Sequence, residues 1–480
     1  MARLRGFFRR LWHERWYLGM SVIGAFIMPH PPVIIPSVGK GEEKRVEKTV
    51  RAYRKAAREI AQLKPETIVV TSPHAVLYAD YLHISPGAGA SGDFRQFGSQ
   101  EGPVSFSYDT QFVEALTQEA KRMRIPAGTF GERNPSVDHG TLVPLTFVNG
   151  EYRGYRLVRC SISGLDPLTH YNFGRCIARA AEKLNRRTVM IASGDLSHKL
   201  KEDGPYGFAA EGPQFDRQVT EAMKTGDFLR FLTFDSAFCE AAAECGLRSF
   251  MILAGVFDGV AVEPEFLSYE GPFGVGYAVC GFRPKGPDES RRFGPKYLEW
   301  KRGAMKKQRE NEDVYVRLAR LSLETWVRTG RRAALPDDLP PELTGRRAGV
   351  FVSLHKDGAL RGCIGTILPV QGSVADEIVR NAISAGTHDP RFEPVREEEL
   401  PDLVYSVDVL GAPAPISSMN ELDPRRYGVI VRSGDRCGLL LPDLPGVDTP
   451  RRQVEIALRK ADIRLDEAFR MERFEAVRHT

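Results

Sequence analysis

Short apolar runs alternate with longer amphipathic stretches through the first 284 residues of the chain. The short runs are rich in β-branched residues, as in the segment TIVVT at residues 67–71. The longer stretches repeat apolar side chains every three or four residues, the spacing of a helix with one buried face. We predict strands at 22–28, 67–71, 156–161, 188–192, 263–269 and 275–282, and helices at 43–63, 109–123, 168–184, 214–224 and 237–257. This alternation predicts an α/β domain at 20–284 whose mostly parallel sheet is covered by helices.

The pattern changes after a polar segment that is rich in proline and glycine. Residues 285–295 belong to this segment and are predicted to be an interdomain linker. Beyond it, a smaller α+β domain is expected at 296–480, because a hairpin pattern replaces the strand–helix alternation. Its elements are predicted as helices at 313–329, 374–385 and 452–461, and strands at 349–354, 360–364, 403–410, 429–432 and 438–441.

The first nineteen residues, 1–19, are basic and aromatic and lack the cleavage site of a signal peptide. We expect them to form a disordered or membrane-surface extension before the first domain. No apolar run reaches the ~18 residues that a membrane helix needs, so stable membrane insertion is not expected.

Composition excludes several classes of protein. The net charge of +5 is too close to neutrality to indicate a nucleic-acid-binding protein. The seven cysteines form no CxxC pair, which argues against a disulfide framework, a zinc ribbon or an iron–sulfur cluster. An odd, scattered set of thiols fits the reducing cytoplasm.

Histidines follow the predicted strands closely. His30 and His74 come directly after the first two strands, and His198 follows the strand at 188–192 within the segment SGDLSH. His139 lies in a segment that we expect to be a loop. Ligands of open α/β sheets bind outside the carboxyl ends of the parallel strands, so these histidines and Asp195 are expected to converge there.

Two of these histidines are natural metal ligands. Neutral imidazole suits iron, zinc, copper and nickel, and two histidines with one carboxylate form the ferrous site of oxygen-activating enzymes. His30 and His74 are the predicted pair. Glu244 is the candidate carboxylate, and its neighbour Cys245 is a thiolate alternative. Fe(II) is the expected metal, with Cu or Zn as alternatives.

His198 is the predicted general acid/base, because a histidine titrates near neutral pH. Asp195 would hold it in one tautomer if residues 194–198 begin a helical turn. His139 would lie across the cleft and contact a substrate oxygen. The alternative is that these histidines only stabilise the turns in which they lie.

Residues 20–283 resemble the Memo-like branch of the class III extradiol dioxygenase superfamily. The resemblance rests on short segments in a fixed order, which are 29–32, 72–75, DHGTLVPL at 138–145, SGDLSH at 193–198 and ECGLRS at 244–249. It implies ferrous iron bound at His30, His74 and a downstream glutamate. It also implies that His198 and His139 are the acid/base and substrate-side histidines. Memo-type proteins have a cysteine at the third ligand position, which Cys245 matches, so the choice between it and Glu244 stays open.

The second half resembles the AMMECR domain through LRGCIGT at 360–366, DPRF at 389–392 and LLLPDLPGVDTPRRQV at 439–454. A small-molecule pocket near Arg361, Cys363, Asp389 and Arg391 is one interpretation, because two glycines flank Cys363 and allow close backbone approach. A structural turn with a buried Arg–Asp pair is an equally good alternative.

Fusions of these two modules resemble the AmmeMemoRadiSam system, which implies a radical SAM enzyme as a partner. Three functions follow. The first is a metal-dependent oxidoreductase of dioxygenase type that acts on a small aromatic or heteroaromatic ring. The second is an oxygen-independent oxidoreductase component that acts on an indole-like compound with the radical partner. The third is a non-catalytic module that binds a ligand or a peptide.

Overall fold

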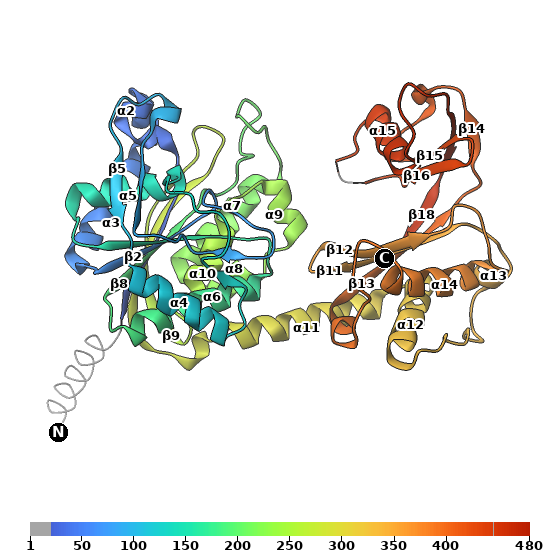
Figure 1. Cartoon of the computed structure of the whole chain (residues 1–480), viewed down its shortest axis with the longest axis horizontal. Coiled ribbons are helices and arrows are strands. Elements are labelled where there is room, and N and C mark those ends of the chain that lie inside the picture. Colours follow the sequence, from blue (N-terminus) through green and yellow to red (C-terminus); the bar gives the residue numbers. More distant parts are fainter. Residues whose placement is uncertain (1–20, 445) are drawn as a thin grey trace. The chain divides into compact units, whose positions relative to one another are not determined.

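A computed structural model of the chain describes residues 21–444 and 446–480 (Figure 1). The predicted extension at 1–19 lies outside the described residues. The chain divides into two compact units, Met1–Lys301 and Arg302–Thr480, which are called unit 1 and unit 2 below. Among the described residues, no helix is both long and apolar enough to span a bilayer.

Unit 1 is built on a six-stranded mixed sheet with the strand order β7-β2-β8-β1-β10-β9. Four neighbouring strands are parallel, and an antiparallel hairpin completes one edge. The strands are β1 (Val22–Met28), β2 (Thr67–Ser72), β7 (Arg156–Ser161), β8 (Thr188–Ser193), β9 (Val260–Glu270) and β10 (Tyr277–Pro287). The apolar runs predicted these strands because both faces of the central strands are buried.

Two apolar cores lie on the two faces of this sheet, because successive side chains of a strand point to opposite faces. Ile27 of β1 belongs to one core, and Phe26 and Met28 to the other. The helices over the first core are α4 (Thr110–Arg122), α6 (Pro167–Lys183), α7 (Glu211–Thr225), α8 (Phe228–Leu232), α9 (Ser236–Ala242) and α10 (Leu247–Val256). Those over the second are α3 (Glu47–Leu63) and α5 (His139–Glu151). The smaller elements are α2 (Pro36–Gly39), β3 (Leu82–His83), β4 (Gly89–Gly92), β5 (Val104–Ser107) and β6 (Ala127–Gly128).

Unit 2 contains two four-stranded sheets with the orders β12-β11-β13-β18 and β14-β17-β15-β16. The strands are β11 (Val350–Lys356), β12 (Ala359–Gly365), β13 (Leu403–Leu410), β14 (Ala414–Ile416), β15 (Gly428–Ser433), β16 (Arg436–Leu440), β17 (Arg470–Phe474) and β18 (Ala476–His479). The helices are α12 (Val314–Thr329), α13 (Pro341–Thr344), α14 (Val374–Thr387) and α15 (Pro450–Lys460). α12 and α14 share one core with the first sheet, and α15 packs on the second.

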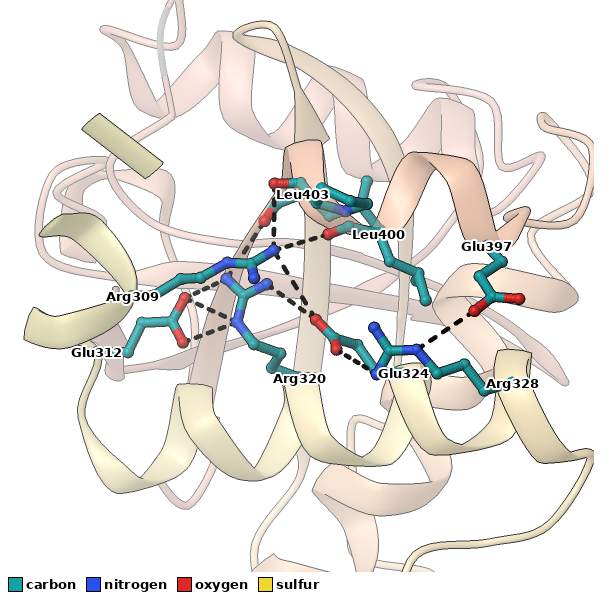
Figure 2. Close-up of polar contacts among 9 residues, drawn as sticks. Arg309, Glu312, Arg320, Glu324, Arg328, Glu397, Leu400 and Leu403 are labelled. Carbon is teal, nitrogen blue, oxygen red and sulfur yellow. Dashed lines mark hydrogen bonds and ion pairs between the residues drawn. The ribbon is translucent and has the colours of Figure 1, made fainter. Parts of the chain in front are cut away.

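A chain of ion pairs fixes α12 within unit 2 (Figure 2). Arg320 binds Glu312 with two nitrogens, and these two side chains are only 12% and 3% exposed. Glu324 lies 3.4 Å from Arg320 and 2.9 Å from Arg328, at the next turn of the helix. Arg309, near the end of α11 (Phe293–Asn311), donates to the backbone oxygen of Leu400. The network therefore joins α12 to the chain segments before and after it.

Three local predictions differ from the structure. The single helix predicted at 237–257 is two helices, α9 and α10, with a short loop between them. Residues 285–295, predicted as a linker, contain the end of β10, a 3-10 turn at Glu289–Arg291 and the start of α11. Phe293 and Tyr297 of α11 are buried in a core of unit 1, so the division between the units falls inside this helix. His139, predicted in a loop, is the first residue of α5.

Candidate metal centre

Three side chains from distant parts of unit 1 converge at the carboxyl ends of β1 and β2. His30 and His74 follow these strands, and Cys245 lies in the loop between α9 and α10. One nitrogen or sulfur atom from each lies within 4.8 Å of the other two. The Nε2 atoms of His30 and His74 are 3.0 Å apart, and Cys245 Sγ is 3.7 Å from His30 Nε2.

The hydrogen bonds of His30 determine its tautomer. Ser193 Oγ donates its only hydrogen to the backbone oxygen of Gly140, at 2.6 Å. Ser193 Oγ therefore accepts the 3.0 Å bond from His30 Nδ1–H. The hydrogen lies on Nδ1, so Nε2 presents a lone pair toward His74 and Cys245. Burial lowers the pKa of His30 well below its ordinary value, which keeps the ring neutral.

His74 is the solvent-facing member of the cluster. Its side chain is exposed, whereas His30 is buried and Cys245 is half-buried. The backbone N–H of His74 donates to Ser72 Oγ at 3.1 Å, and Ser72 Oγ donates to Asp138 Oδ1. Asp138 also caps the N-terminus of α5. The same carboxylate therefore positions His74 and the helix that begins with His139.

Cys245 is brought to the cluster by the contact of two glycines. A Cβ atom on Gly194 would lie 2.1 Å from Gly246 Cα, so the loop after β8 and the loop before α10 touch through their backbones. This contact places Cys245 Sγ 3.3 Å from the backbone nitrogen of Asp195, which donates to it. Burial raises the pKa of the Cys245 thiol well above its ordinary value. A bound cation would reverse that effect by stabilising the thiolate.

Glu244, the alternative third ligand, points elsewhere. Its Oε2 accepts a 2.7 Å hydrogen bond from the backbone nitrogen of Leu247, in the first turn of α10. It is not among the clustered groups. The structure therefore favours Cys245 over Glu244 at the third position, and Glu244 stabilises the start of the helix.

Asp195 contacts His30 of the cluster. Its Oδ1 accepts from the backbone nitrogen of His30 at 2.7 Å, and Oδ2 is 3.9 Å from His30 Nε2. Residues 194–198 form no helical turn, so the condition on which Asp195 was expected to orient His198 is not met. Burial raises the pKa of Asp195 to about 6. When ionised, its carboxylate adds negative charge beside the three clustered groups.

His139 and His198 lie near His30 but do not belong to the cluster. The His139 ring centroid is 4.1 Å from that of His74 and 5.4 Å from that of His30. Burial, with the neighbouring histidines, lowers the pKa of His139 to about 3, so its ring is neutral at pH 7. The His198 ring meets the exposed ring of Tyr206 edge-on at 5.1 Å, and its Nδ1 is buried with no partner among the described residues.

Several contributors to the site were not singled out by the sequence analysis. Ser193 and Gly194 lie inside the segment SGDLSH, whose histidine and aspartate drew attention instead. Phe97, whose ring lies 5.3 Å from that of His139, comes from a 3-10 turn with no periodic signal. Ser193 acts through its hydroxyl, Gly194 through a backbone contact and Phe97 through ring packing, and residue type alone does not indicate these roles.

Comparisons with known proteins assign a family to each unit. A family model described as the catalytic LigB subunit of aromatic ring-opening dioxygenase matches residues 24–280. The chain belongs to the LigB family. A second model, AMMECR1, matches residues 316–479, so an AMMECR1 domain follows the LigB domain. LigB family members are metal-dependent.

Relatives share this two-domain arrangement or part of it. Protein CA_C1420 of Clostridium acetobutylicum is 41% identical over 469 residues, which cover 96% of this chain and 99% of that protein. A protein of Thermotoga maritima is 53% identical over 153 residues, covering 32% of this chain and 88% of its own. The crystal structure of the uncharacterised protein PH0010 from Pyrococcus horikoshii covers 34% of this chain and 88% of its own, with 34% identity and a TM-score of 0.33.

The donor set of the LigB domain fits a single metal ion. Two imidazole nitrogens and one sulfur are ligands that iron, copper and zinc all accept. Metal–nitrogen bonds of ~2.0–2.1 Å and metal–sulfur bonds of ~2.3 Å join ligand atoms that are about 3–4 Å apart. The 3.0 and 3.7 Å separations lie in that range. His30, with its Nε2 lone pair directed at the other two groups, is already in the tautomer that binds metal.

The residues predicted in the AMMECR1 domain form two ion pairs. Arg391 binds both carboxylate oxygens of Asp389, which also accepts from the backbone nitrogen of Cys363 at 2.9 Å. Arg361 instead binds both oxygens of Glu399. The structure thus brings Cys363, Asp389 and Arg391 into direct contact, and it pairs Arg361 with a carboxylate that the sequence analysis did not name.

Proposed function

We propose that unit 1 is a metal-dependent oxidoreductase related to the class III extradiol dioxygenases, acting on a small aromatic or heteroaromatic ring. One observation carries the proposal, namely the convergence of His30, His74 and Cys245 beside His139 and His198, which lie outside that cluster. Fe(II) is the proposed metal, and Cu or Zn are the alternatives. When bound, such an ion would supply Lewis acidity, and iron or copper would also supply redox chemistry.

The flanking residues suit an aromatic substrate. Phe97 and Tyr206 present rings next to His139 and His198, and Tyr206 is 59% exposed. Aromatic rings pack edge-to-face or offset against one another, so these side chains would orient a planar substrate. The neutral His139 ring would donate or accept a hydrogen bond to a substrate oxygen, and His198 would move the proton of a ring hydroxyl or ring nitrogen.

Metal content is the direct test of the site. Replacement of His74 with alanine is expected to abolish stoichiometric metal binding to anaerobically purified protein, because it removes one of three ligand atoms. Cys245→Ala should weaken binding strongly, whereas Glu244→Gln should leave the metal content unchanged, because its oxygen caps α10. Elemental analysis of the variants alongside the wild type provides the measurement. Full metal content in Cys245→Ala, or absence of metal from the wild type after loading with iron, copper and zinc, would refute the proposed coordination.

The role of His198 is tested separately from metal binding. His198→Gln is expected to keep the fold and the metal but to lower turnover by roughly 10²–10⁴-fold, the usual contribution of general acid–base catalysis. Turnover is measured with a panel of catechols and indoles, with and without oxygen. Circular dichroism and metal content are the controls. An unchanged rate in this variant would remove His198 from the mechanism.

The thiol of Cys245 favours a second candidate, an oxygen-independent component that acts on an indole-like compound. A cysteine ligand is sensitive to oxidation, which suits anaerobic chemistry better than repeated oxygen activation. The fusion of the two domains supports a radical SAM enzyme as the partner that makes or consumes this compound. Turnover that requires the partner and survives removal of oxygen would establish this candidate. Stoichiometric oxygen uptake without the partner would exclude it.

A further inference from the structure

Asp216 of α7 is a buried carboxyl group that lies outside the metal centre, and it is only 1% exposed. Its Oδ1 accepts a 2.8 Å hydrogen bond from the backbone nitrogen of Ser197, and its Oδ2 accepts a 2.7 Å hydrogen bond from the hydroxyl of Tyr269. Among the described residues no cation pairs with it, and burial raises its pKa to about 7. A buried acid without a cation partner costs stability, which makes Asp216 a candidate for a functional role.

The surrounding backbone leaves room for this carboxyl group. A Cβ atom on Gly276 would lie 2.0 Å from Asp216 Oδ2, so any other residue there would displace the carboxyl group. The backbone nitrogen of Gly276 donates to the oxygen of Ser197 at 2.8 Å, and the Gly276 oxygen accepts from the nitrogen of Leu196 at 2.8 Å. Asp216 therefore completes the backbone hydrogen bonding of Ser197, in the loop that follows β8.

Ser197 connects Asp216 to His198 and to the loop of the proposed third ligand. Its hydroxyl donates to the backbone oxygen of Ala242 at 2.8 Å, and the backbone nitrogen of His198 donates to the same oxygen at 3.2 Å. Ala242 is the last residue of α9, three residues before Cys245. The position of the His198 backbone relative to Cys245 therefore depends on how Ser197 is held.

The imidazole of His198 has few contacts of its own. Its Nδ1 is buried and has no hydrogen-bond partner among the described residues, and its ring meets Tyr206 edge-on at 5.1 Å. Tyr206 is itself exposed and lies in the loop between β8 and α7. The backbone at Ser197 and His198 therefore determines where the imidazole lies.

We propose that Asp216 is a positioning residue for His198, because it fixes the Ser197 backbone and thereby the place of the imidazole beside the metal centre. Its hydrogen bonds go to Ser197 and Tyr269 and not to the imidazole, so it acts through the backbone. The inference rests on the proposed role of His198 as the general acid/base. Displacement of a catalytic group by about 1 Å lowers the rate by about 10²-fold, so loss of this anchor is expected to lower turnover.

Chemical modification of the imidazole tests the positioning without a substrate. Diethyl pyrocarbonate acylates accessible histidine rings, and the tryptic peptides 188–199 and 381–391 of the full-length protein each contain a single histidine. Asp216→Ala should raise the rate at His198 severalfold relative to the exposed His388, because the loosened backbone uncovers Nδ1. Asp216→Asn should keep the wild-type rate, because an amide still accepts from Ser197 and donates to the Tyr269 oxygen. Equal rates at His198 in the wild type and Asp216→Ala would overturn the proposal.

Kinetics test the effect on turnover. Asp216→Ala should lower kcat about 10–100-fold with little change in KM or metal content, whereas Asp216→Asn should retain most of the activity. Combined with His198→Gln, Asp216→Ala should lower kcat no further, because it acts through the missing imidazole. Full additivity of the two effects, or a rise in KM alone, would also contradict the proposal.

A control variant separates positioning from a general loss of stability. Asp109→Ala removes another buried carboxyl group of unit 1, which binds Thr67 at the amino end of β2. It should lower stability but leave kcat and the modification rate of His198 unchanged. Effects on both quantities as large as those of Asp216→Ala would show that Asp216 is only a structural residue.

Tyr269→Phe keeps the test valid if Asp216→Ala fails to fold, because it removes one of the two donors to the carboxyl group. It should raise the modification rate of His198 less than Asp216→Ala does, and a wild-type rate in this variant would then overturn the proposal. Unchanged turnover in His198→Gln would reject the acid/base role alone. The modification rates, which need no turnover, would still decide whether Asp216 holds the imidazole in place.

Discussion

The hydroxyl of Ser193 determines the tautomer of His30, a residue far from it in the sequence. Because Ser193 Oγ donates to Gly140, it can only accept from His30, and His30 then offers a lone pair on Nε2. Hydrogen bonds of this kind from metal ligands to their neighbours set the ligand tautomer. The serine is therefore expected to contribute to metal affinity without touching the metal.

Ser193→Ala is expected to lower metal affinity by about 10–100-fold, the usual cost of losing such a partner. Competition with a chelator of known affinity gives the measurement. Ser249→Ala is the matched control, because Ser249 is also fully buried in unit 1 but its hydroxyl has no hydrogen-bond partner among the described residues. Equal affinities of the two variants would show that Ser193 does not set the His30 tautomer.

At the scale of elements, the position of Cys245, the proposed third ligand, depends on how two loops meet. The sequence predicted that His30 and His74 lie together, because both follow parallel strands and the carboxyl ends of such strands meet at one edge of the sheet. It could not choose between Glu244 and Cys245, because the break between α9 and α10 falls within a stretch at 237–257 that reads as one helix. The contact of Gly194 with Gly246 joins residues 52 positions apart and produces no local pattern.

Gly194→Ala should therefore displace the Cys245 loop. The added Cβ would lie 2.1 Å from Gly246 Cα, a backbone atom that cannot turn away as a side chain would. We expect a loss of about 1–3 kcal/mol of stability from overpacking, together with reduced metal content. Gly150→Ala is the control, since nothing lies within 4 Å of that position in α5. Denaturant unfolding and metal analysis of both variants provide the comparison, and an unaltered metal content in Gly194→Ala would contradict this account.

Other elements were missed because their patterns are weak. α11 has a long polar surface and carries glycine and proline near its start, which led to the prediction of a linker there. β17 and β18 are short strands at the end of the chain with several charged residues. Tertiary pairing with β14, β15 and β13 determines their structure, and a single segment of sequence does not contain that information.

For the whole molecule, the two units have separate cores and different titrating groups. Among the residues that the structure describes, burial lowers the pKa of five histidines in unit 1, but of only His355 in unit 2. Below pH ~6.5 the histidines of the unfolded chain bind protons, whereas the same rings stay neutral in the folded protein. The free energy of unfolding therefore decreases as the pH falls. Asp195 and Asp216, whose pKa values burial raises to about 6 and about 7, offset part of this loss.

In unit 2 one titrating group is a carboxyl. Burial would raise the pKa of Glu399, but the hydrogen bonds from Arg361 outweigh burial and lower it to about 2. Its contribution is therefore lost only between about pH 4.3 and 2.

The metal-free protein is therefore expected to melt in two calorimetric transitions, one for each unit. Acidification should lower the melting temperature of unit 1 before that of unit 2. Between pH 7.5 and 5.5 the unit 1 transition should fall by at least about 3 °C more than that of unit 2. Glu312→Gln identifies the transition of unit 2, because it removes the charge that Arg320 binds in the buried network of Figure 2. Breaking a buried ion pair costs about 3 kcal/mol or more, so this variant should shift that transition alone. A single transition at every pH would contradict the separate cores. A melting temperature of unit 2, marked by Glu312→Gln, that falls at a higher pH than that of unit 1 would contradict the titrations given to the two units.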